Sequence, residues 1–308
     1  MMKNIILIPF AFKNGYRGGV NISTQTSPFD TYLKNCCVSC ISARKNCGRE
    51  TDVALITNID VPEPYYTILT GAGALILKYE FDNFNFNADY SWSLAFYKLN
   101  ALYHAVEDLS YDNFAYMDSD VYVQSDFCNI WKECSKNILL YDICHGLQVK
   151  DYRELIQEIN EFTGEDSIGL THYGGEFFAA NKQNAKHFVQ ECLDIYREML
   201  RKSFQTSHGD EFITSLAASH MNCIRNAGAY IYRYWTGAFR LISTNYQFNP
   251  VTVLHVPAEK NHGMLRIFDN FIVHDKFPTQ KIVWRILHIS HPSWKLAIYL
   301  KLKHFVKI

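Results

Sequence analysis

The chain has 308 residues, of which 48% are hydrophobic and 20% are charged. A chain of this length and composition buries a sizeable core, which excludes an intrinsically disordered protein and favours one large domain. The net charge of −1 gives no general affinity for nucleic acid, so we expect no nucleic-acid partner.

The compartment is indicated by the cysteines and by the apolar runs. Nine Cys is an odd number in a large chain and fits a reduced compartment better than a disulfide scaffold. No stretch reaches the roughly 18 apolar residues of a membrane span, and the run Ile5–Phe10 is too short for a secretory signal. We therefore expect a cytoplasmic location.

A cluster of cysteines, Cys36, Cys37, Cys40 and Cys47, invites a zinc interpretation. It holds one CxxC spacing, but no second pair follows at zinc-finger distance. On a helix, Cys36 and Cys40 share one face, so we expect buried thiols here, with a metal site as the alternative.

Strand-like and helix-like runs alternate along the chain, as they do in α/β proteins. The predicted strands are Lys3–Pro9, Asp52–Thr57, Ala74–Tyr79, Asn113–Met117, Val121–Val123, Ile138–Cys144, Tyr173–Ala180, Ala229–Trp235 and Thr252–Val256. The predicted helices are Asp30–Lys45, Ser91–Leu109, Phe127–Cys134, Asp151–Phe162, Lys182–Lys202 and Gly209–His220. We expect one domain over residues 1–275, with a mixed central sheet flanked by helices, and a separate tail over residues 276–308.

Two carboxylates directly follow an apolar strand. The strand Asn113–Met117 runs into Asp118-Ser119-Asp120, and Val121–Val123 resumes extended structure. Ligands gather at the carboxyl ends of strands in α/β sheets, and two Asp side chains there need a counter-charge. A hard divalent cation between the carboxylates and a diphosphate would supply it. The alternative is a polar turn with an Asp cap.

Three later segments carry polar residues in unusual settings. They are Tyr173-Gly174-Gly175-Glu176, His208-Gly209-Asp210-Glu211, and the stretch from His255 to Lys260. Glu176 stands between two glycines and the apolar run Phe177–Ala180, which is an odd place for a solvated acid. Asp210 and Glu211 open a predicted helix, where acids also complement the helix dipole.

These segments, with Lys98 on the helix before the strand, resemble the GT-A glycosyltransferases in content and order. The resemblance covers residues 3–262 and is nearest to the retaining bacterial lipopolysaccharide galactosyltransferase type, family 8. The strings at Gly174 and His208 are also similar to the retaining blood-group type, family 6. The chain departs from family 8 at Glu211, where that family has Gln, and at Ala258-Glu259, where it usually has Gly before the Lys.

The resemblance implies a Rossmann-like GT-A fold and a set of site residues. Asp118, Asp120 and His255 would hold Mn²⁺ or Mg²⁺ on the diphosphate of a nucleotide-sugar donor. Donor contacts would come from Lys98, Ser119, Gly174, Gly175 and Lys260. Glu211, Asp210 and Glu176 are the candidates for the catalytic group near the anomeric carbon; they would act in a retaining reaction, or one would be the general base of an inverting one.

Each of these residues also has a plainer interpretation. His255 ends an apolar run and is otherwise a satisfied core histidine. Lys260 is otherwise a solvated lysine on the surface, and Lys98 otherwise caps a helix face. The first strand ends at Pro9 and Phe10 before a Gly-containing loop, and we expect these two residues to frame the nucleotide, although the loop has no phosphate-binding signature.

The tail is basic and aromatic. Residues 276–308 hold seven Lys or Arg and no Asp or Glu. On a helix, Lys295, Tyr299, Lys303 and Lys307 form a stripe, which suits an anionic membrane surface. The alternative is a C-terminal helix packed on the domain. We expect peripheral attachment to the inner face of the cytoplasmic membrane.

The leading hypothesis is therefore a metal-dependent hexosyltransferase that uses a UDP-sugar and a lipid-linked or cell-envelope glycan acceptor, such as lipopolysaccharide, O-antigen or capsule. The alternatives are a sugar nucleotidyltransferase or metal phosphoesterase, and a non-catalytic glycan-binding protein on the same fold.

Overall fold

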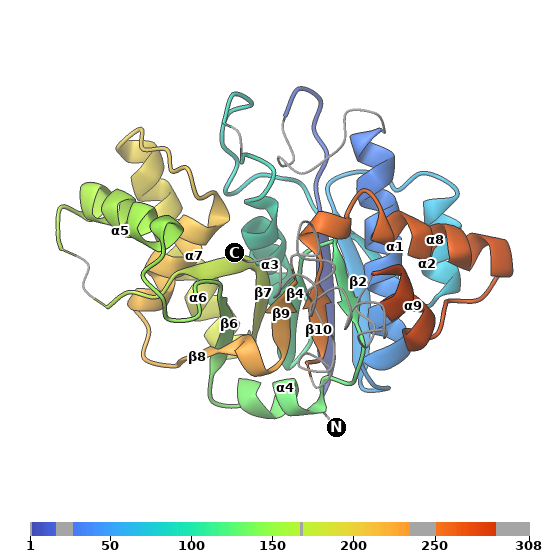
Figure 1. Ribbon diagram of the computed structural model, residues 1–308. Helices are drawn as coiled ribbons and strands as arrows, with labels where there is room; N and C mark the ends of the chain where they lie inside the picture. The colour runs from blue at the N-terminus through green and yellow to red at the C-terminus, as the bar shows by residue number, and fades with distance from the viewer. Residues whose placement is uncertain (1, 17–26, 91, 167–168, 235–250, 288–308) are drawn as a thin grey trace, which may run out of the picture.

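The computed structural model describes residues 2–16, 27–90, 92–166, 169–234 and 251–287. Within them the alternating pattern builds a seven-stranded sheet of order β3-β2-β1-β4-β7-β6-β8 (Figure 1). Its strands are β1 (Asn4–Phe10), β2 (Thr51–Thr57), β3 (Leu75–Lys78), β4 (Asn113–Met117), β6 (Ile138–Asp142), β7 (Tyr173–Asn181) and β8 (Ile224–Asn226). All of them run parallel except β7, which is antiparallel to both of its neighbours.

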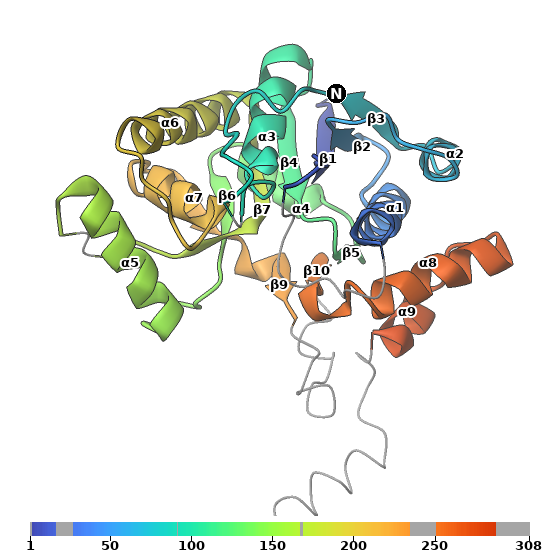
Figure 2. The same cartoon turned by 90° about the horizontal axis from the view of Figure 1, so that it is seen from above.

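Alternate residues of the central strands face two separate cores. Ile6 and Ile8 of β1 lie in the core beneath α1 (Pro28–Asn46), whereas Ile5 and Leu7 lie in the core beneath the helices of the other face. Those helices are α3 (Tyr97–Asp108), α6 (Lys182–Arg201) and α7 (Asp210–Ser219). The two layers are seen on opposite sides of the sheet in Figure 2. Burial on both faces explains the continuous apolar runs of these strands.

A small second sheet places one histidine beside the acidic turn. It has the order β5-β10-β9, from Val121–Val123, Val253–His255 and Ile231–Arg233. In this sheet His255 pairs with Val121 on one side and with Arg233 on the other. Because Val121 directly follows Asp120, the pairing brings His255 to the acidic turn although the two lie far apart in sequence.

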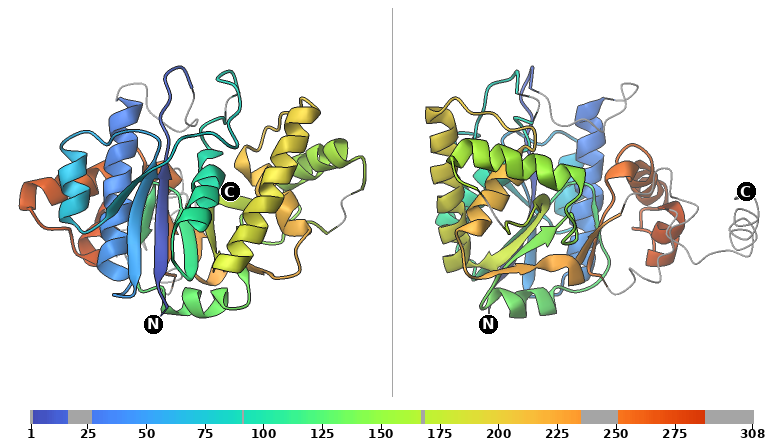
Figure 3. Two further views of the ribbon diagram at one scale, coloured as in Figure 1. Left: turned by 180° about the vertical axis from the view of Figure 1, so that it is seen from behind. Right: turned by 60° about the vertical axis from the view of Figure 1, so that its left-hand side comes forward.

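The remaining helices lie at the ends and edges of the sheet or on the outer side of α1 (Figure 3). They are α2 (Tyr65–Gly71), α4 (Cys128–Cys134), α5 (Lys150–Thr163), α8 (Gly263–His274) and α9 (Gln280–Ile286). Helix α5 ends as the sequence predicts, because Gly164 adopts a left-handed conformation with φ of 78°.

The α/β class and the mixed sheet are confirmed, and the strands lie within two or three residues of their predicted bounds. Helix α3 begins at Tyr97 and not at Ser91. The preceding residues Trp92–Phe96 form tight turns instead, where Phe96 packs into a buried aromatic cluster with Phe86 and Tyr90. The sequence pattern also missed α2, β8, α8 and α9.

The cysteines of α1 and the cysteine that caps its C-terminus are buried, as preferred from the sequence. Cys36, Cys37, Cys40 and Cys47 are all buried free thiols. Burial raises the pKa of Cys37 to about 12 and raises those of Cys36 and Cys40 well above the usual value. These side chains are neutral and apolar in character.

The basic C-terminal region begins with a packed helix. Val283 of α9 and the following Leu287 are fully buried in the core beneath α1. The indole of Trp284 donates a hydrogen bond of 3.0 Å to Gln124. The stripe predicted at Lys295–Lys307 lies outside the described residues. Within the residues described, every helix is too short or too polar to cross a membrane.

Candidate active site

A cavity of about 500 Å³ opens where the parallel strands end. Leu7 of β1 pairs with Tyr116 of β4, so Pro9 and Phe10 reach the same edge of the sheet as Asp118. The structure brings together ten of the residues singled out from the sequence. Those lining the cavity are Pro9, Phe10, Lys98, Asp118, Ser119, Asp120, Asp210, Glu211, His255 and Lys260.

Asp118, Asp120 and His255 form a group with the spacing of metal ligands. One ligand atom from each lies within 4.8 Å of the others. The Nε2 atom of His255 lies 3.6 Å from a carboxylate oxygen of Asp118 and 3.5 Å from one of Asp120. These distances are too long for good hydrogen bonds but allow one ion to contact all three groups.

The turn that carries these aspartates is held by backbone contacts. The Asp120 carbonyl accepts a hydrogen bond of 3.0 Å from Val256 N, and the Asp118 amide donates one of 3.1 Å to the Glu176 carbonyl. The hydroxyl of Ser39 in α1 donates to the carbonyl of Ser119 at 2.6 Å. The backbone of the turn is therefore held by contacts that do not involve the two carboxylates.

Asp120 is ionised and lacks a full set of partners. Only 1% of the residue is exposed. Burial alone would raise its pKa, but the positive charges of Lys260 and His255 hold the pKa of Asp120 well below its usual range. Its buried Oδ2 atom has no hydrogen bond, although Lys260 Nζ lies 3.3 Å away. An anionic oxygen with an open coordination position fits a divalent cation.

Glu176 is a buried partner of other side chains and does not line the cavity. The guanidinium of Arg233 donates two hydrogen bonds to it, of 2.6 and 2.7 Å. Burial opposes ionisation, but Arg233 and His255 lower the pKa of Glu176 well below its usual value. Glu176 also lies 3.4 Å from the Nδ1 atom of His255. It is thus placed to orient His255 toward the aspartates.

Glu211 is a charged carboxylate at the cavity wall. Arg233 Nη2 lies 3.0 Å from one of its oxygens and His172 Nε2 lies 3.0 Å from the other. Burial would raise its pKa, but Arg233 and His172 lower it. The side chain keeps 22% of its surface exposed, so this ionised group faces the cavity.

Asp210 and Lys98 form a buried ion pair next to the metal-ligand group. Lys98 Nζ lies 2.9 Å from Asp210 and 3.0 Å from Asp118. Burial, with a contribution from the Asp118 charge, raises the pKa of Asp210 to about 6 even though Lys98 acts in the opposite direction. Lys98 therefore lies between the two acidic motifs.

The two glycines of β7 make room for carboxylates. A Cβ atom on Gly175 would overlap the carboxylate of Asp210, and one on Gly174 would overlap that of Glu176. The space near these glycines is taken up by acidic side chains of the protein, and neither glycine lines the cavity.

The charged partners of Glu176 and Glu211, Arg233 and His172, were missed from the sequence. Arg233 stands in the apolar run Ala229–Trp235, and His172 stands in the loop before β7. Neither position carries a motif, so only contacts across the fold identify them.

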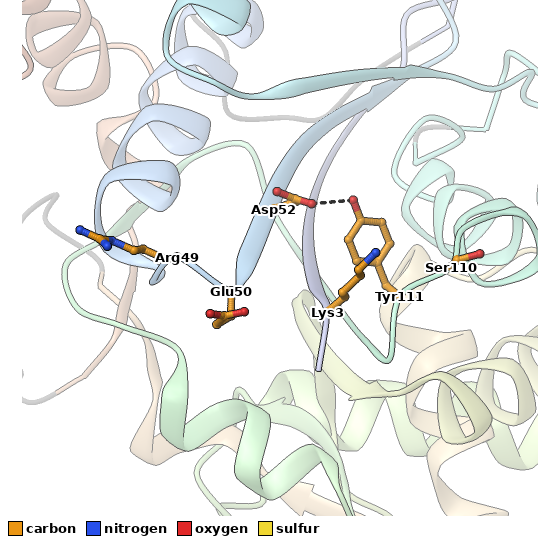
Figure 4. A pocket seen from close by; sticks show the side chains of 6 residues that line it. All are labelled: Lys3, Arg49, Glu50, Asp52, Ser110 and Tyr111. Atoms are coloured by element: carbon orange, nitrogen blue, oxygen red, sulfur yellow. Dashed lines mark hydrogen bonds between the residues drawn. The ribbon is translucent and has the colours of Figure 1, made fainter. Parts of the chain in front are cut away.

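A second pocket lies at the opposite edge of the sheet, where β1 and β2 begin (Figure 4). It is lined by Lys3, Arg49, Glu50, Asp52, Ser110 and Tyr111. The Tyr111 hydroxyl donates a hydrogen bond of 2.8 Å to Asp52. None of the ligand-spaced groups among the described residues lies here, so the cavity at the carboxyl ends is the candidate active site.

Comparison with known proteins places the fold. No protein-family model and no curated protein sequence matches the chain. Among solved structures it is similar to the galactosyltransferase LgtC in complex with donor and acceptor sugar analogues, with 15% identity, a TM-score of 0.54, and coverage of 92% of this chain and 99% of that one. An active-site mutant of LgtC gives a TM-score of 0.56 at the same identity and coverage.

The glycosyltransferase GlyE of Streptococcus pneumoniae TIGR4 also matches, with 13% identity and a TM-score of 0.49. That match covers the whole of this chain, which spans 65% of the length of GlyE. The mixed seven-stranded sheet, its flanking helices and the likeness to LgtC show that the chain has the GT-A glycosyltransferase fold that its motifs predict.

Proposed function

We propose that the protein is a metal-dependent glycosyltransferase that transfers a hexose from a nucleoside diphosphate sugar, most simply a UDP-hexose. The observation that carries the proposal is the group Asp118, Asp120 and His255, which faces the cavity at the carboxyl ends of the sheet. The likeness of the fold to a galactosyltransferase seen with donor and acceptor sugar analogues supports it.

The donor diphosphate would lie against the acidic turn. Mn²⁺ or Mg²⁺ held by Asp118, Asp120 and His255 would neutralise charge on the leaving diphosphate. Lys260 adds a positive charge beside Asp120, where it would contact a phosphate oxygen. Pro9, Phe10 and Ser119 line the same region and would frame the nucleotide.

The sugar would lie toward α7, where Glu211 has a lowered pKa and Asp210 a raised one. Glu211 is ionised and held by Arg233 and His172, so we assign it the task of stabilising positive charge at the anomeric carbon in a retaining transfer. Asp210 would fix Lys98 beside the donor. Glu176, which is buried and paired with Arg233, would position His255 and not contact the sugar.

The acceptor would bind against the aromatic side chains that line the cavity. We expect it to be a membrane-bound glycan. Phe12, Phe29, Tyr32 and Trp92 line the cavity and offer apolar faces for sugar rings. The basic residues of 276–308 would hold the protein at an anionic bilayer surface on the cytoplasmic side. A lipid-linked envelope glycan, as in lipopolysaccharide, O-antigen or capsule, fits this arrangement.

The test is a donor screen with product analysis. Purified protein is incubated with UDP-, GDP- and CDP-hexoses, with and without Mn²⁺, and products are identified by mass spectrometry. We expect a metal-dependent release of UDP and a transferred or hydrolysed hexose, with at least a hundredfold loss in Asp120→Asn. The exposed Asp269→Asn on α8 is the matched control and should behave as wild type.

The other products separate the alternatives. Formation of a hexose 1-phosphate with a nucleoside monophosphate would instead indicate a phosphoesterase, and condensation of a nucleoside triphosphate with that hexose phosphate would indicate a nucleotidyltransferase. Binding of glycans without turnover of any donor would overturn the proposal in favour of a binding protein.

A further inference from the structure

A second group of metal-ligating side chains lies beside the active site. Of the described residues, Cys144, Asp151 and His172 place one ligand atom each within 4.8 Å of one another. They come from three segments: the loop after β6, the first turn of α5, and the loop before β7. Cys144 and His172 are buried, and Asp151 lines the cavity wall.

The separations within this group match those between ligands of a single zinc ion. Zn–S bonds of about 2.3 Å and Zn–N or Zn–O bonds of about 2.0–2.1 Å at tetrahedral angles put sulfur and nitrogen about 3.5 Å apart, and nitrogen and oxygen about 3.4 Å apart. The Nδ1 atom of His172 lies 3.6 Å from Cys144 Sγ and 3.6 Å from Asp151 Oδ2. The contact to Asp151 is too long for a hydrogen bond.

The histidine is oriented as zinc-binding histidines are. Its outer nitrogen, Nε2, lies 3.0 Å from the carboxylate of Glu211, which leaves the lone pair of Nδ1 facing Cys144 and Asp151. A carboxylate on the outer nitrogen fixes the tautomer and increases the basicity of the ligating nitrogen.

A second histidine, His208, lies beside the group and also has a carboxylate next to one of its ring nitrogens. His208 Nδ1 lies 3.0 Å from Glu158, and its other nitrogen, Nε2, lies 3.8 Å from Asp151. The rings of His172 and His208 are 5.6 Å apart at an angle of 77°. His208 therefore lies next to Asp151 but outside the ligand spacing of the three-residue group, so a water molecule would be the fourth ligand of a tetrahedral site.

The backbone around the cysteine is held in a fixed loop. Asp142 accepts hydrogen bonds from the amides of Cys144 and Gly146, at 3.0 and 2.8 Å. The amide of Ile143 donates to the carbonyl of His172 at 3.2 Å. The thiol is thus presented to His172 before any ion binds, which lowers the entropy cost of forming a site.

We propose that Cys144, Asp151 and His172 bind one Zn²⁺ that is separate from the cation of the donor site. The ion would join α5 to the ends of β6 and β7, and through His172 it would fix Glu211 at the cavity wall. This inference goes beyond the proposed function and does not require it, because the site would bind its ion without a donor sugar.

The metal-free alternative leaves part of the group unexplained. A thiol that donates to His172 Nδ1 accounts for the sulfur–nitrogen contact, but not for Asp151 at the same distance from that nitrogen. Burial raises the pKa of the Cys144 thiol to about 11, so the free side chain is neutral and zinc binding would release its proton.

Cobalt is the probe that distinguishes this site from the donor site. Co²⁺ bound to a thiolate gives a charge-transfer band in the near ultraviolet, which an all-carboxylate and histidine site lacks. The protein is stripped of metal and titrated with Co²⁺ in the background Asp118→Asn/Asp120→Asn, so that the donor site is disabled. We expect one equivalent of Co²⁺, a thiolate band, and displacement of the cobalt by Zn²⁺.

Variants assign the band to the proposed ligands. Cys144→Ser should abolish it, whereas the matched control Cys128→Ser, which removes an exposed thiol outside the group, should keep it. Asp151→Asn changes a side chain that is 58% exposed, so it will fold, and it should weaken Co²⁺ binding at least tenfold. Absence of a thiolate band in the parent protein would overturn the proposal. So would persistence of the band in a Cys144→Ser protein whose circular dichroism spectrum shows that it is folded. Neither readout depends on glycosyl transfer.

Discussion

The Arg233 guanidinium donates two hydrogen bonds, of 2.6 and 2.7 Å, to the carboxylate of Glu176, and Glu176 is fully buried. Arg233 stands on β9 of the small sheet and Glu176 on β7 of the large one, so the pair joins the two sheets beneath the site. The same guanidinium contacts Glu211 at 3.0 Å. One arginine therefore contributes to the lowered pKa of both glutamates.

Removing that arginine should strongly lower the free energy of unfolding. Arg233→Ala leaves Glu176 as a buried charge without its main partner, which costs about 3–5 kcal/mol. Arg225, which is paired with Glu133 at the surface at 2.8 Å, is the matched control; Arg225→Ala should cost less than about 1 kcal/mol. Urea unfolding followed by circular dichroism measures both, and equal losses would show that the Arg233 pair contributes no more than a surface ion pair.

Asp210 should make the metal-free protein less stable as the pH rises. Its pKa is raised from 3.8 to about 6 in the folded state, so between these values the folded state holds a proton that the unfolded state has released. The stabilisation from this proton is complete below about pH 4 and is lost as the pH rises through 6.

Asp210→Asn mimics the protonated form and should therefore be more stable than wild type at pH 8, with the difference vanishing near pH 4. Melting temperatures of both proteins across this range test the assignment. The proposed role of Asp210 beside Lys98 predicts that the same variant loses transferase activity. A variant that is less stable at pH 8 would contradict the raised pKa.

The stability of the fold should depend on the absence of a side chain at Gly175. In Gly175→Ala the added Cβ would overlap the buried carboxylate of Asp210, and overpacking of this kind costs about 1–3 kcal/mol. Gly71 has no atom within 4 Å of the corresponding position, so Gly71→Ala serves as the control and should be neutral or slightly stabilising. Chemical denaturation of the two variants gives the comparison.

Lys260 should contribute to donor binding through its charge. The ammonium lies 3.3 Å from Asp120 and over the ring of Tyr32, with 5.1 Å to the ring centroid. A charge-assisted contact to phosphate is worth about 1.5–3 kcal/mol, so Lys260→Gln should weaken UDP binding in Mn²⁺ at least tenfold by calorimetry. The exposed Lys281→Gln on α9 is the control. Unchanged affinity in Lys260→Gln would show that the lysine faces away from the diphosphate.

The sequence alone determined the parts of the fold that depend on local pattern. The strand Asn113–Met117 and the acidic turn after it follow from an apolar run that ends in two carboxylates, and they are found as predicted. Helix α6 and the end of α5 at Gly164 follow from amphipathic spacing and a glycine stop.

Elements with weak local pattern were not predictable. The edge strand β8 reads Ile-Arg-Asn and is largely exposed, so it shows neither alternation nor an apolar run. Helix α9 has only seven residues, and it is fixed by burial of Val283 against the rest of the domain. For such elements tertiary contacts supply most of the stabilisation, and these contacts leave little trace in local sequence.

The sequence by itself therefore determined the α/β class, the main strands and helices, and the acidic residues that face the cavity. Only the tertiary structure decided the partners of those acids: Arg233 for Glu176 and Glu211, Lys98 for Asp210, and the group of Cys144, Asp151 and His172. The physical reason is that a carboxylate needs a compensating charge or ligand nearby in space, and chain folding can bring that partner from any distance in the sequence.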